Sequence, residues 1–600
     1  METSLIFKDD LVMIKKRISD IFRDKLVKKV LFITPPPVSK DIIDLEGCLK
    51  KRYSCFPPYS LLILSDILRK KGFEVSVLDL NYEILKFIQS SADISDYDTI
   101  WKYFLNKKIK EFNPDLIGIT CMFTMTHTVF CQVCDEIARY DIPTVIGGVH
   151  VSNDAERVLH SIKNNRLIAC TYESEVSFPN LLEYINSLND IELTQLSMII
   201  DGKFYSIKER QLPSKNEINF MPAFDLINAD LYSSIGSIGS FVSILPKNAK
   251  ISTVLSNKGC RAMCSFCSVR NFNGMGVRQR DVNFIVDEIE MLKKKYGINH
   301  IMWLDDDLFF NQERTISLFE EITRRSINIT WDASNGVIAA ACTPKLIKAA
   351  AESGCIGLYF GLESGNPEIL LKVKKPGTLK NFYNAANILK DYPKIFTRGF
   401  LMIGFPHETL RQIKDTLDLG LNLGLDWYAI NILQPLPSTP IYESMVNEGL
   451  IEDKLDTNLT RYTTGPYGKA TQIERQEKEK AHQFINPFEG DLDRVPTRDE
   501  LNDIWFYMNY KINFEPIKKL TNPIKLDLIT KLLTDVADRV TTNHALTNLF
   551  LAICHSKCGN TKELLDRMRK TEQCLKESAY WRDKFENLGL YKDLEDLKSS

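Results

Sequence analysis

Residues 259–270 read Gly-Cys-Arg-Ala-Met-Cys-Ser-Phe-Cys-Ser-Val-Arg, and this stretch places three cysteines in one short segment. Cys260, Cys264 and Cys267 stand at C-x3-C-x2-C spacing, which lets one loop wrap three thiolates around a single cluster. Cubane iron–sulfur clusters take four thiolates, so a loop that supplies three leaves one iron open to another ligand. A zinc knuckle and free thiols are the alternatives, but zinc prefers a fourth Cys or His nearby, and none follows before His300. The spacing therefore favours an iron–sulfur cluster with one open position.

The composition of the whole chain is that of an ordinary globular protein. Its 600 residues suggest several domains, and 44% of them are hydrophobic and 26% charged. The net charge of -2 gives no support for a nucleic acid or an anionic membrane as a partner. Residues 1–20 mix charges with apolar residues, unlike a signal peptide, and no apolar run is long enough to span a membrane. We therefore expect a cytoplasmic protein whose 14 cysteines are reduced thiols or metal ligands.

Short apolar runs alternate with helical patterns through the first part of the chain. A leading helix is predicted at residues 10–27, and buried strands are predicted at residues 29–34, 74–79, 116–120 and 143–146. Alternation of this kind predicts an α/β fold with a doubly wound, Rossmann-like parallel sheet. The ligand crevice of such a sheet lies at the carboxyl ends of its strands.

The pattern is less regular between residues 165 and 245. Residues 199–205 predict a hairpin, because Asp201-Gly202 suits a tight turn, and residues 213–222 predict a connector. Nothing in this part of the sequence indicates chemistry.

After the cysteine loop the chain alternates between helix and strand again. Strands are predicted at residues 251–255, 300–304, 329–333, 357–360, 398–403 and 427–433. The second of them ends in Asp305, Asp306 and Asp307, whose carboxylates repel one another unless a cation lies there. We therefore expect a cationic group at this strand end, and a solvated turn is the alternative.

The cysteine spacing, with Phe266 before the last cysteine, resembles that of the radical S-adenosylmethionine (SAM) enzymes. In that family SAM chelates the open iron of a 4Fe-4S cluster, and an electron from the cluster cleaves SAM to a 5'-deoxyadenosyl radical. The resemblance implies a partial (β/α)6 barrel whose reactive end is the carboxyl end of its strands. It implies cluster ligands at the three cysteines. The SAM contacts that it implies are Phe266, Asp305, Asp306, Gly361, Glu363, Ser364, Gly404 and Glu408.

The N-terminal sheet resembles the cobalamin-binding domain found before radical SAM domains. The likeness rests on a strand followed by Pro35-Pro36-Pro37 and on residues 56–62, 69–75 and 146–150. The glycine pair in the last segment would let the backbone approach the nucleotide tail of cobalamin. The implied cobalamin contacts are Pro36, Thr120, Thr124, Gly147, Gly148 and His150.

The positions of the histidines indicate whether a protein side chain would bind the cobalt of cobalamin. One variant of this domain places a cobalt-ligating histidine after the first strand, but residues 35–39 contain none. The resemblance therefore implies base-off cobalamin without a protein histidine on cobalt. We expect His127 and His150 to be polar residues at the rim of the crevice. The alternative for the whole domain is a flavodoxin-like sheet that has lost its ligand.

Together the two resemblances imply a cobalamin-dependent radical SAM enzyme. The expected reaction is methyl transfer to an unactivated carbon of a small-molecule or natural-product substrate, with flavodoxin or ferredoxin as the electron donor. A rearrangement, ring contraction or cyclisation without methylation is the alternative reaction. A cobalamin sensor with an inactive barrel and an RNA methylthiotransferase are weaker alternatives. No catalytic side chain is assigned by the sequence.

The C-terminal part lacks barrel patterns. Residues 470–483 are highly charged and predict an exposed helix or linker, and residues 498–600 predict a helical cap over the active site. Its aromatic residues Trp505, Tyr507, Tyr510 and Phe514 belong either to a substrate pocket or, preferably, to the core of this part. The predicted divisions of the chain are 1–27, 28–190, 191–245, 246–445 and 446–600.

Overall fold

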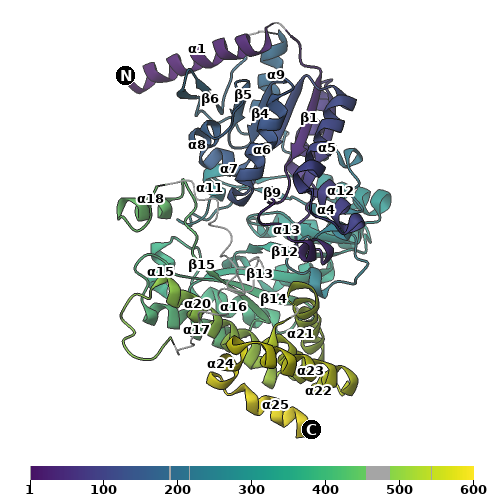
Figure 1. Ribbon diagram of the computed structural model, residues 1–600, viewed down its shortest axis with the longest axis vertical. Coiled ribbons are helices and arrows are strands. Elements are labelled where there is room, and N and C mark those ends of the chain that lie inside the picture. Colours follow the sequence, from purple (N-terminus) through teal and green to yellow (C-terminus); the bar gives the residue numbers. More distant parts are fainter. Residues whose placement is uncertain are drawn as a thin grey trace.

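The computed structural model describes residues 2–23, 25–187, 191–214, 217–453, 487–541 and 543–599. One sheet with its helices lies at one end of the molecule, a second sheet lies in the middle, and the C-terminal helices lie at the other end (Figure 1). No helix in the described ranges is long and apolar enough to cross a membrane.

The first sheet has the doubly wound fold predicted from the sequence. Its strands lie in the order β2-β1-β3-β4-β5-β6-β7, and β1 to β5 are parallel. This is the flavodoxin-like order, whose switch point lies between β1 and β3. The first five strands are β1 (Lys29–Thr34), β2 (Glu74–Asp79), β3 (Leu116–Thr120), β4 (Thr144–Gly147) and β5 (Leu167–Cys170). Sequence patterns missed β5, which has only four residues.

Alternate residues of these strands pack against helices on opposite faces of the sheet. Phe32 and Val145 belong to the core under α3 and α9, whereas Ile33 and Ile146 belong to the core under α4, α5 and α6. Burial on both faces explains why the strands are almost continuously apolar. The helices of this part are α1 (Glu2–Phe22), α2 (Leu45–Leu49), α3 (Tyr59–Lys70), α4 (Leu80–Ser91), α5 (Tyr97–Phe112), α6 (His127–Ala138), α7 (Val149–Asn153), α8 (Ala155–His160) and α9 (Ser177–Ser187).

The predicted hairpin is present and consists of β6 (Leu196–Ile200) and β7 (Lys203–Ser206). Asp201 and Gly202 both have positive φ, at 49° and 78°, as a tight two-residue hairpin turn requires. Because β6 pairs with β5, the hairpin extends the first sheet. The sequence had grouped it with the connector instead.

The second sheet has six parallel strands, as predicted. Their order is β15-β14-β13-β12-β11-β8, and β15 does not pair with β8 in the described ranges, so the barrel stays open. The strands are β8 (Ile251–Val254), β11 (His300–Trp303), β12 (Thr330–Val337), β13 (Cys355–Glu363), β14 (Phe396–Ile403) and β15 (Trp427–Ile432). The helices are α12 (Val282–Tyr296), α13 (Gln312–Arg324), α14 (Pro344–Glu352), α15 (Pro367–Lys372), α16 (Leu379–Leu389), α17 (Leu410–Leu423) and α18 (Pro440–Asn447).

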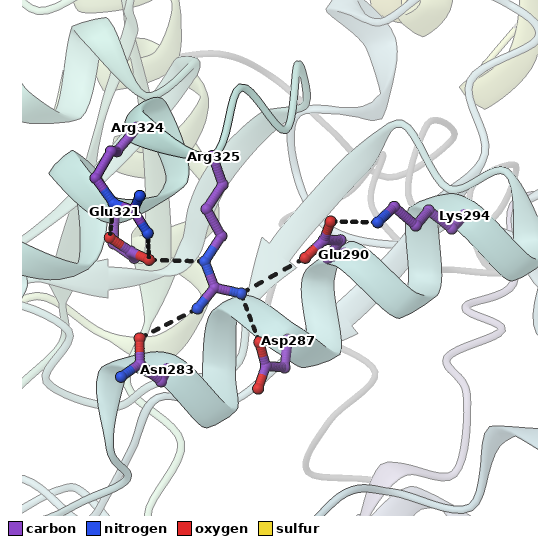
Figure 2. A network of polar contacts seen from close by, with 7 residues as sticks. All are labelled: Asn283, Asp287, Glu290, Lys294, Glu321, Arg324 and Arg325. Carbon is purple, nitrogen blue, oxygen red and sulfur yellow. Dashed lines mark hydrogen bonds and ion pairs between the residues drawn. The ribbon is translucent and has the colours of Figure 1, made fainter.

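A network of charged side chains joins the outer helices α12 and α13. Arg325, just after α13, donates to Glu321 of α13 at 2.7 Å and to Asp287 of α12 at 2.5 Å (Figure 2). The same guanidinium reaches Glu290 and Asn283. Most of these groups are partly exposed, so water screens the network.

The C-terminal helices cover the open edge of the barrel. Trp505 of α20 donates its indole N–H to the carbonyl of Ile430, 2.8 Å away. The Asn513 side chain accepts from the N–H of Tyr428 at 2.7 Å and donates to its carbonyl at 2.9 Å. These side chains satisfy backbone groups at the edge strand β15. The helices are α20 (Arg498–Asn509), α21 (Pro523–Asp535), α22 (Ala545–Lys557), α23 (Thr561–Glu577), α24 (Ala579–Asn587) and α25 (Leu590–Ser599).

In the described part of the chain, α21 lies near the amino ends of the strands rather than over the reactive end as predicted, whereas Leu501 of α20 lies beside Gly404 at the carboxyl end of β14. Lys525 donates to the carbonyl of Ile395 and pairs with Asp426, both of which precede strands. Tyr510 and Phe514 are buried in the helical core, which favours the core interpretation of the aromatic residues. The predicted helix or linker at 470–483 lies outside the described residues.

Candidate cofactor sites

A two-stranded ladder closes the base of the cysteine loop. In this ladder β9 (Asn257–Lys258) pairs with β10 (Arg278–Gln279), on either side of residues 259–277. Gly259 has φ 85°, and a Cβ there would lie 2.5 Å from the carbonyl oxygen of Gly276, so only glycine fits. Backbone hydrogen bonds of Ser265 with Val373 and Ile441 dock the loop on the barrel.

The three thiols are half-buried and free of disulfides. Burial raises the pKa of each thiol, at Cys260, Cys264 and Cys267, to about 11. Metal binding would therefore release protons from this loop. In the described part of the chain no three His, Cys, Asp or Glu side chains converge on the position of a single metal ion. A cubane cluster needs no such convergence, because each thiolate binds a different iron. The donor set fits a cluster better than zinc.

The three consecutive carboxylates after β11 have different partners. Asp305 accepts hydrogen bonds from the Ser256 backbone and hydroxyl, at 2.9 and 2.5 Å, and so ties the ends of β11 and β8 together. Asp307 forms a two-point ion pair with Arg261 of the cysteine loop, at 2.6 and 2.9 Å. Both carboxylates therefore stabilise the local backbone conformation, Asp305 through Ser256 and Asp307 through Arg261. The prediction of a SAM contact is therefore not supported for Asp305.

Asp306 differs from its neighbours. Its carboxylate accepts from the Asn273 amide at 3.0 Å, and no ion pair with Asp306 occurs in the described ranges. Burial, and then the charges of Asp305 and Asp307, raise its pKa to about 7. A cation beside Asp306 would relieve this cost.

The end of β13 brings Glu363 to the barrel opening and turns Ser364 away from it. Glu363 pairs with Lys375 at 2.8 Å, and a Cβ on Gly361 would lie 2.5 Å from the Lys375 ammonium. The Ser364 hydroxyl is fully buried and shares a hydrogen bond with Thr416 at 3.1 Å. Ser364 therefore anchors this segment to α17, and the structure does not support a SAM contact there.

The segment after β14 is shaped by Glu408. One carboxylate oxygen accepts from the backbone N–H groups of Gly404 and Phe405, at 2.7 and 3.1 Å. Burial raises the pKa of Glu408 to about 8, and its second oxygen is buried without a partner in the described residues. Phe266 packs against Phe405, with ring centres 6.2 Å apart, in a small apolar cluster. Phe266 thus helps to hold the cysteine loop against the barrel, and Glu408 shapes the segment that carries Phe405.

The first sheet contains an open cavity. It lies at the carboxyl ends of β3, β4 and β5, under α3 and α9, and the predicted residues Thr120, Gly147 and Gly148 line it. Gly148 has φ 104°, and a Cβ there would lie 2.5 Å from the Cys121 carbonyl oxygen. Lys258 of β9 lines the same cavity. Pro36, Thr124 and His150 are not among the lining residues.

Two family models match the chain. The B12 binding domain matches residues 47–182, and the Radical SAM superfamily matches residues 254–420. The chain belongs to the radical SAM enzymes that carry a cobalamin-binding domain. The first match covers the sheet with the glycine-lined cavity, and the second covers the cysteine loop and most of the barrel.

Named relatives agree with this family. An uncharacterised methyltransferase of Pyrococcus horikoshii is 27% identical over 443 residues, which are 73% of this chain and 87% of that protein. Cytidylyl-2-hydroxyethylphosphonate methyltransferase of Streptomyces wedmorensis is 22% identical over 480 residues, covering 74% and 88% of the two chains.

A solved structure shows the same fold. The radical SAM methyltransferase TsrM of Kitasatospora setae, solved with tryptophan substrate and a SAM analogue, matches with a TM-score of 0.58 at 18% identity. The match covers 90% of this chain and 99% of TsrM. Another TsrM structure contains cobalamin and a [4Fe-4S] cluster.

The sequence predicts that the two histidines of the cobalamin-binding domain lie at the rim of the crevice. In the structure both are buried. His127 and His150 are 7% and 2% exposed, and their rings share a hydrogen bond of 3.0 Å. Thr124 is 3.3 Å from the other nitrogen of His150. Burial lowers the pKa of both rings, that of His150 to about 3, so both are neutral near pH 7. The prediction failed because α6 and α7 pack these residues together.

Sequence reasoning missed Lys375 in this radical SAM domain. Its side chain is 11% exposed and lies between Glu363 and the cysteine loop. Burial lowers the pKa of Lys375, but the Glu363 carboxylate and the Cys264 thiol raise it more, so the ammonium stays charged. No spacing rule points to a lysine in the irregular segment after α15.

Proposed function

We propose that this protein is a cobalamin-dependent C-methyltransferase. It would act on an unactivated carbon of a small-molecule or natural-product substrate. The observation that carries the proposal is the position of the cysteine loop beside the glycine-lined cavity. Lys258 and Phe272, which stand on either side of the three cysteines in sequence, both line that cavity. This arrangement would bring the cluster and cobalamin close together in one enzyme.

When bound, the 4Fe-4S cluster would supply the electron that cleaves SAM to a 5'-deoxyadenosyl radical, and cobalamin would carry the methyl group. The chain's own part is to bind and orient these groups. Cys260, Cys264 and Cys267 would hold the cluster. Asp306 would accept hydrogen bonds from the ammonium of SAM, because it lacks a cationic partner in the described ranges.

The remaining side chains hold these groups in position. Lys375 and Glu363 form a charged pair at the barrel opening, and Gly361 leaves room for that pair. Gly147 and Gly148 would let the backbone approach the cobalamin tail. The family resemblance implies base-off cobalamin. We expect no protein histidine on cobalt, because His127 and His150 hydrogen-bond to each other and residues 35–39 contain no histidine.

Methyl transfer is favoured over rearrangement, ring contraction or cyclisation, because the relatives described above are named methyltransferases. Tryptophan bound in TsrM supports a small molecule as the substrate class. Flavodoxin or ferredoxin remains the proposed electron donor, and the reduced thiols support a cytoplasmic location.

Anaerobic purification from cells supplied with cobalamin tests the proposal. We expect about four irons and one cobalamin per chain, a reducible cluster signal in the electron paramagnetic resonance spectrum, and a base-off cobalt(II) signal. Dithionite with SAM should yield 5'-deoxyadenosine. A protein that holds the cluster but never binds cobalamin would contradict the proposed methyl transfer.

A further inference from the structure

The helix that follows the last cluster cysteine is held by the cobalamin-binding part of the chain. This helix, α11 (Val269–Asn273), begins two residues after Cys267. Arg210 donates to the carbonyl of Asn271 at 2.6 Å, and the Asn271 amide donates to Asn153 of α7 at 3.0 Å. Phe272 of the same helix lines the cavity in the first sheet. The wall of that cavity is therefore built partly from the cysteine loop.

Two buried ion pairs join the same parts at the base of the loop. Lys258 of β9 pairs with Glu175, and Arg278 of β10 pairs with Glu173. Both glutamates follow β5 of the first sheet, and their side chains are 9% and 1% exposed. Arg278 also donates to the carbonyl of Asn273 at the end of α11. Each strand of the ladder is thus fixed to a carboxylate of the cobalamin-binding part.

In each of these carboxylates only one of the two oxygens forms the ion pair. Oε2 of Glu173 and Oε2 of Glu175 are buried and have no hydrogen-bond partner in the described residues. Both residues line the cavity. A buried acceptor without a partner is costly, so the arrangement suits a ligand that brings N–H or O–H donors into the cavity. The tail and side arms of cobalamin carry ribose hydroxyl and amide groups of this kind.

We propose that Glu173 and Glu175 couple the two cofactors, each accepting a hydrogen bond from cobalamin with one oxygen and holding the cysteine loop with the other. This inference rests on the proposed function. Donors from cobalamin would fix the two carboxylates, and the fixed carboxylates would hold Lys258 and Arg278 at the base of the loop. Cobalamin would therefore favour the loop conformation that binds the cluster. Because such coupling is reciprocal, the cluster would raise the affinity for cobalamin by the same factor.

The test compares cobalamin affinity in cluster-free and cluster-loaded full-length protein, measured by the change in the cobalamin absorbance spectrum. We expect the cluster to strengthen binding about tenfold, a coupling of ordinary size. In Glu173→Gln and Glu175→Gln the two affinities should become equal, although each variant still binds both cofactors. Glu111→Gln, which removes an exposed carboxylate of α5, is the matched control and should keep the tenfold difference.

A second measurement needs no variant. Amide hydrogen exchange in residues 259–277 of the cluster-free protein should slow when cobalamin is added. Equal cobalamin affinities with and without the cluster, or unchanged exchange, would overturn the coupling and leave the proposed function standing. A complete lack of cobalamin binding would overturn both.

Discussion

The cysteine loop and the glycine-lined cavity prepare for their cofactors in opposite ways. The loop presents side chains, because three thiols and the Asp306 carboxylate would be the groups that bind. The cavity presents backbone, because Gly147 and Gly148 line it and a Cβ on either would meet a neighbouring backbone carbonyl, whereas the nearby imidazoles of His127 and His150 hydrogen-bond to each other. Ligating side chains are visible in sequence spacing, whereas a backbone cradle depends on what packs around it.

The largest effect is expected from removing one ligand of the loop. Cys264→Ala should leave the cluster incomplete and reduce SAM cleavage to about 1% of wild type or less, since a cubane cluster needs its thiolates. Iron content and 5'-deoxyadenosine production measure the loss. Cys558→Ala is the control, because Cys558 is exposed at the end of α22. Normal deoxyadenosine production in the Cys264 variant would sink the cluster assignment.

The cavity should instead respond to a substitution of a glycine in its wall. Gly148→Ala places a Cβ 2.5 Å from the Cys121 carbonyl oxygen, at positive φ, and should weaken cobalamin binding about tenfold or more while iron content stays normal. The added Cβ could act through the positive φ or through the close contact. Gly202→Ala is the control for the first cause, because Gly202 also has positive φ but nothing lies within 4 Å of its Cβ position. Equal cobalamin affinity in the two variants would contradict the backbone cradle.

Substitutions of the neighbouring carboxylates Asp306 and Asp305 should have different effects, the first on SAM binding and the second on the stability of the fold. Asp306→Asn should weaken SAM binding by about ten- to hundredfold, because a hydrogen bond to a charged group contributes about 1.5–3 kcal/mol. Asp305→Asn should mainly lower the free energy of unfolding, by about 1–3 kcal/mol, because its carboxylate holds Ser256. Equilibrium SAM binding and denaturant unfolding check the pair. The opposite pattern would show that Asp305 faces SAM.

The buried imidazole pair should make the first sheet sensitive to acid. The pKa of His150 is lowered from 6.5 to about 3 in the folded chain, so the unfolded state binds more protons below pH 6.5. The free energy of unfolding should therefore fall by about 2 kcal/mol from this group between pH 7 and pH 5. Denaturant unfolding of His150→Gln should lack that loss. An identical pH dependence in both proteins would contradict the buried neutral pair.

The smallest effect is expected far from both sites. Arg325→Ala breaks the partly exposed network between α12 and α13 in Figure 2 and should cost about 1 kcal/mol or less, since water screens such pairs. Unfolding measures this change, and both cofactors should bind as in wild type. A loss of cofactor binding would show that the outer helices help to shape the sites.

The sequence alone determined the features that depend on neighbouring residues. The spacing of Cys260, Cys264 and Cys267 indicated the cluster, and the periodic apolar runs predicted two parallel sheets, including all six strands of the barrel. The Asp201-Gly202 turn predicted its hairpin. These patterns are local, because backbone geometry and side-chain periodicity act over a few residues.

Tertiary structure decided which of the predicted side chains are available. Asp307 meets Arg261, 46 positions away, and Ser364 meets Thr416, 52 positions away, and both contacts remove a group that the sequence left open. Lys375, the burial of His150 and the edge contact of Trp505 are equally invisible in the sequence. Their partners come from distant segments, and only packing brings those segments together. A side chain's type can be known from the sequence, but its charge state and freedom depend on its surroundings.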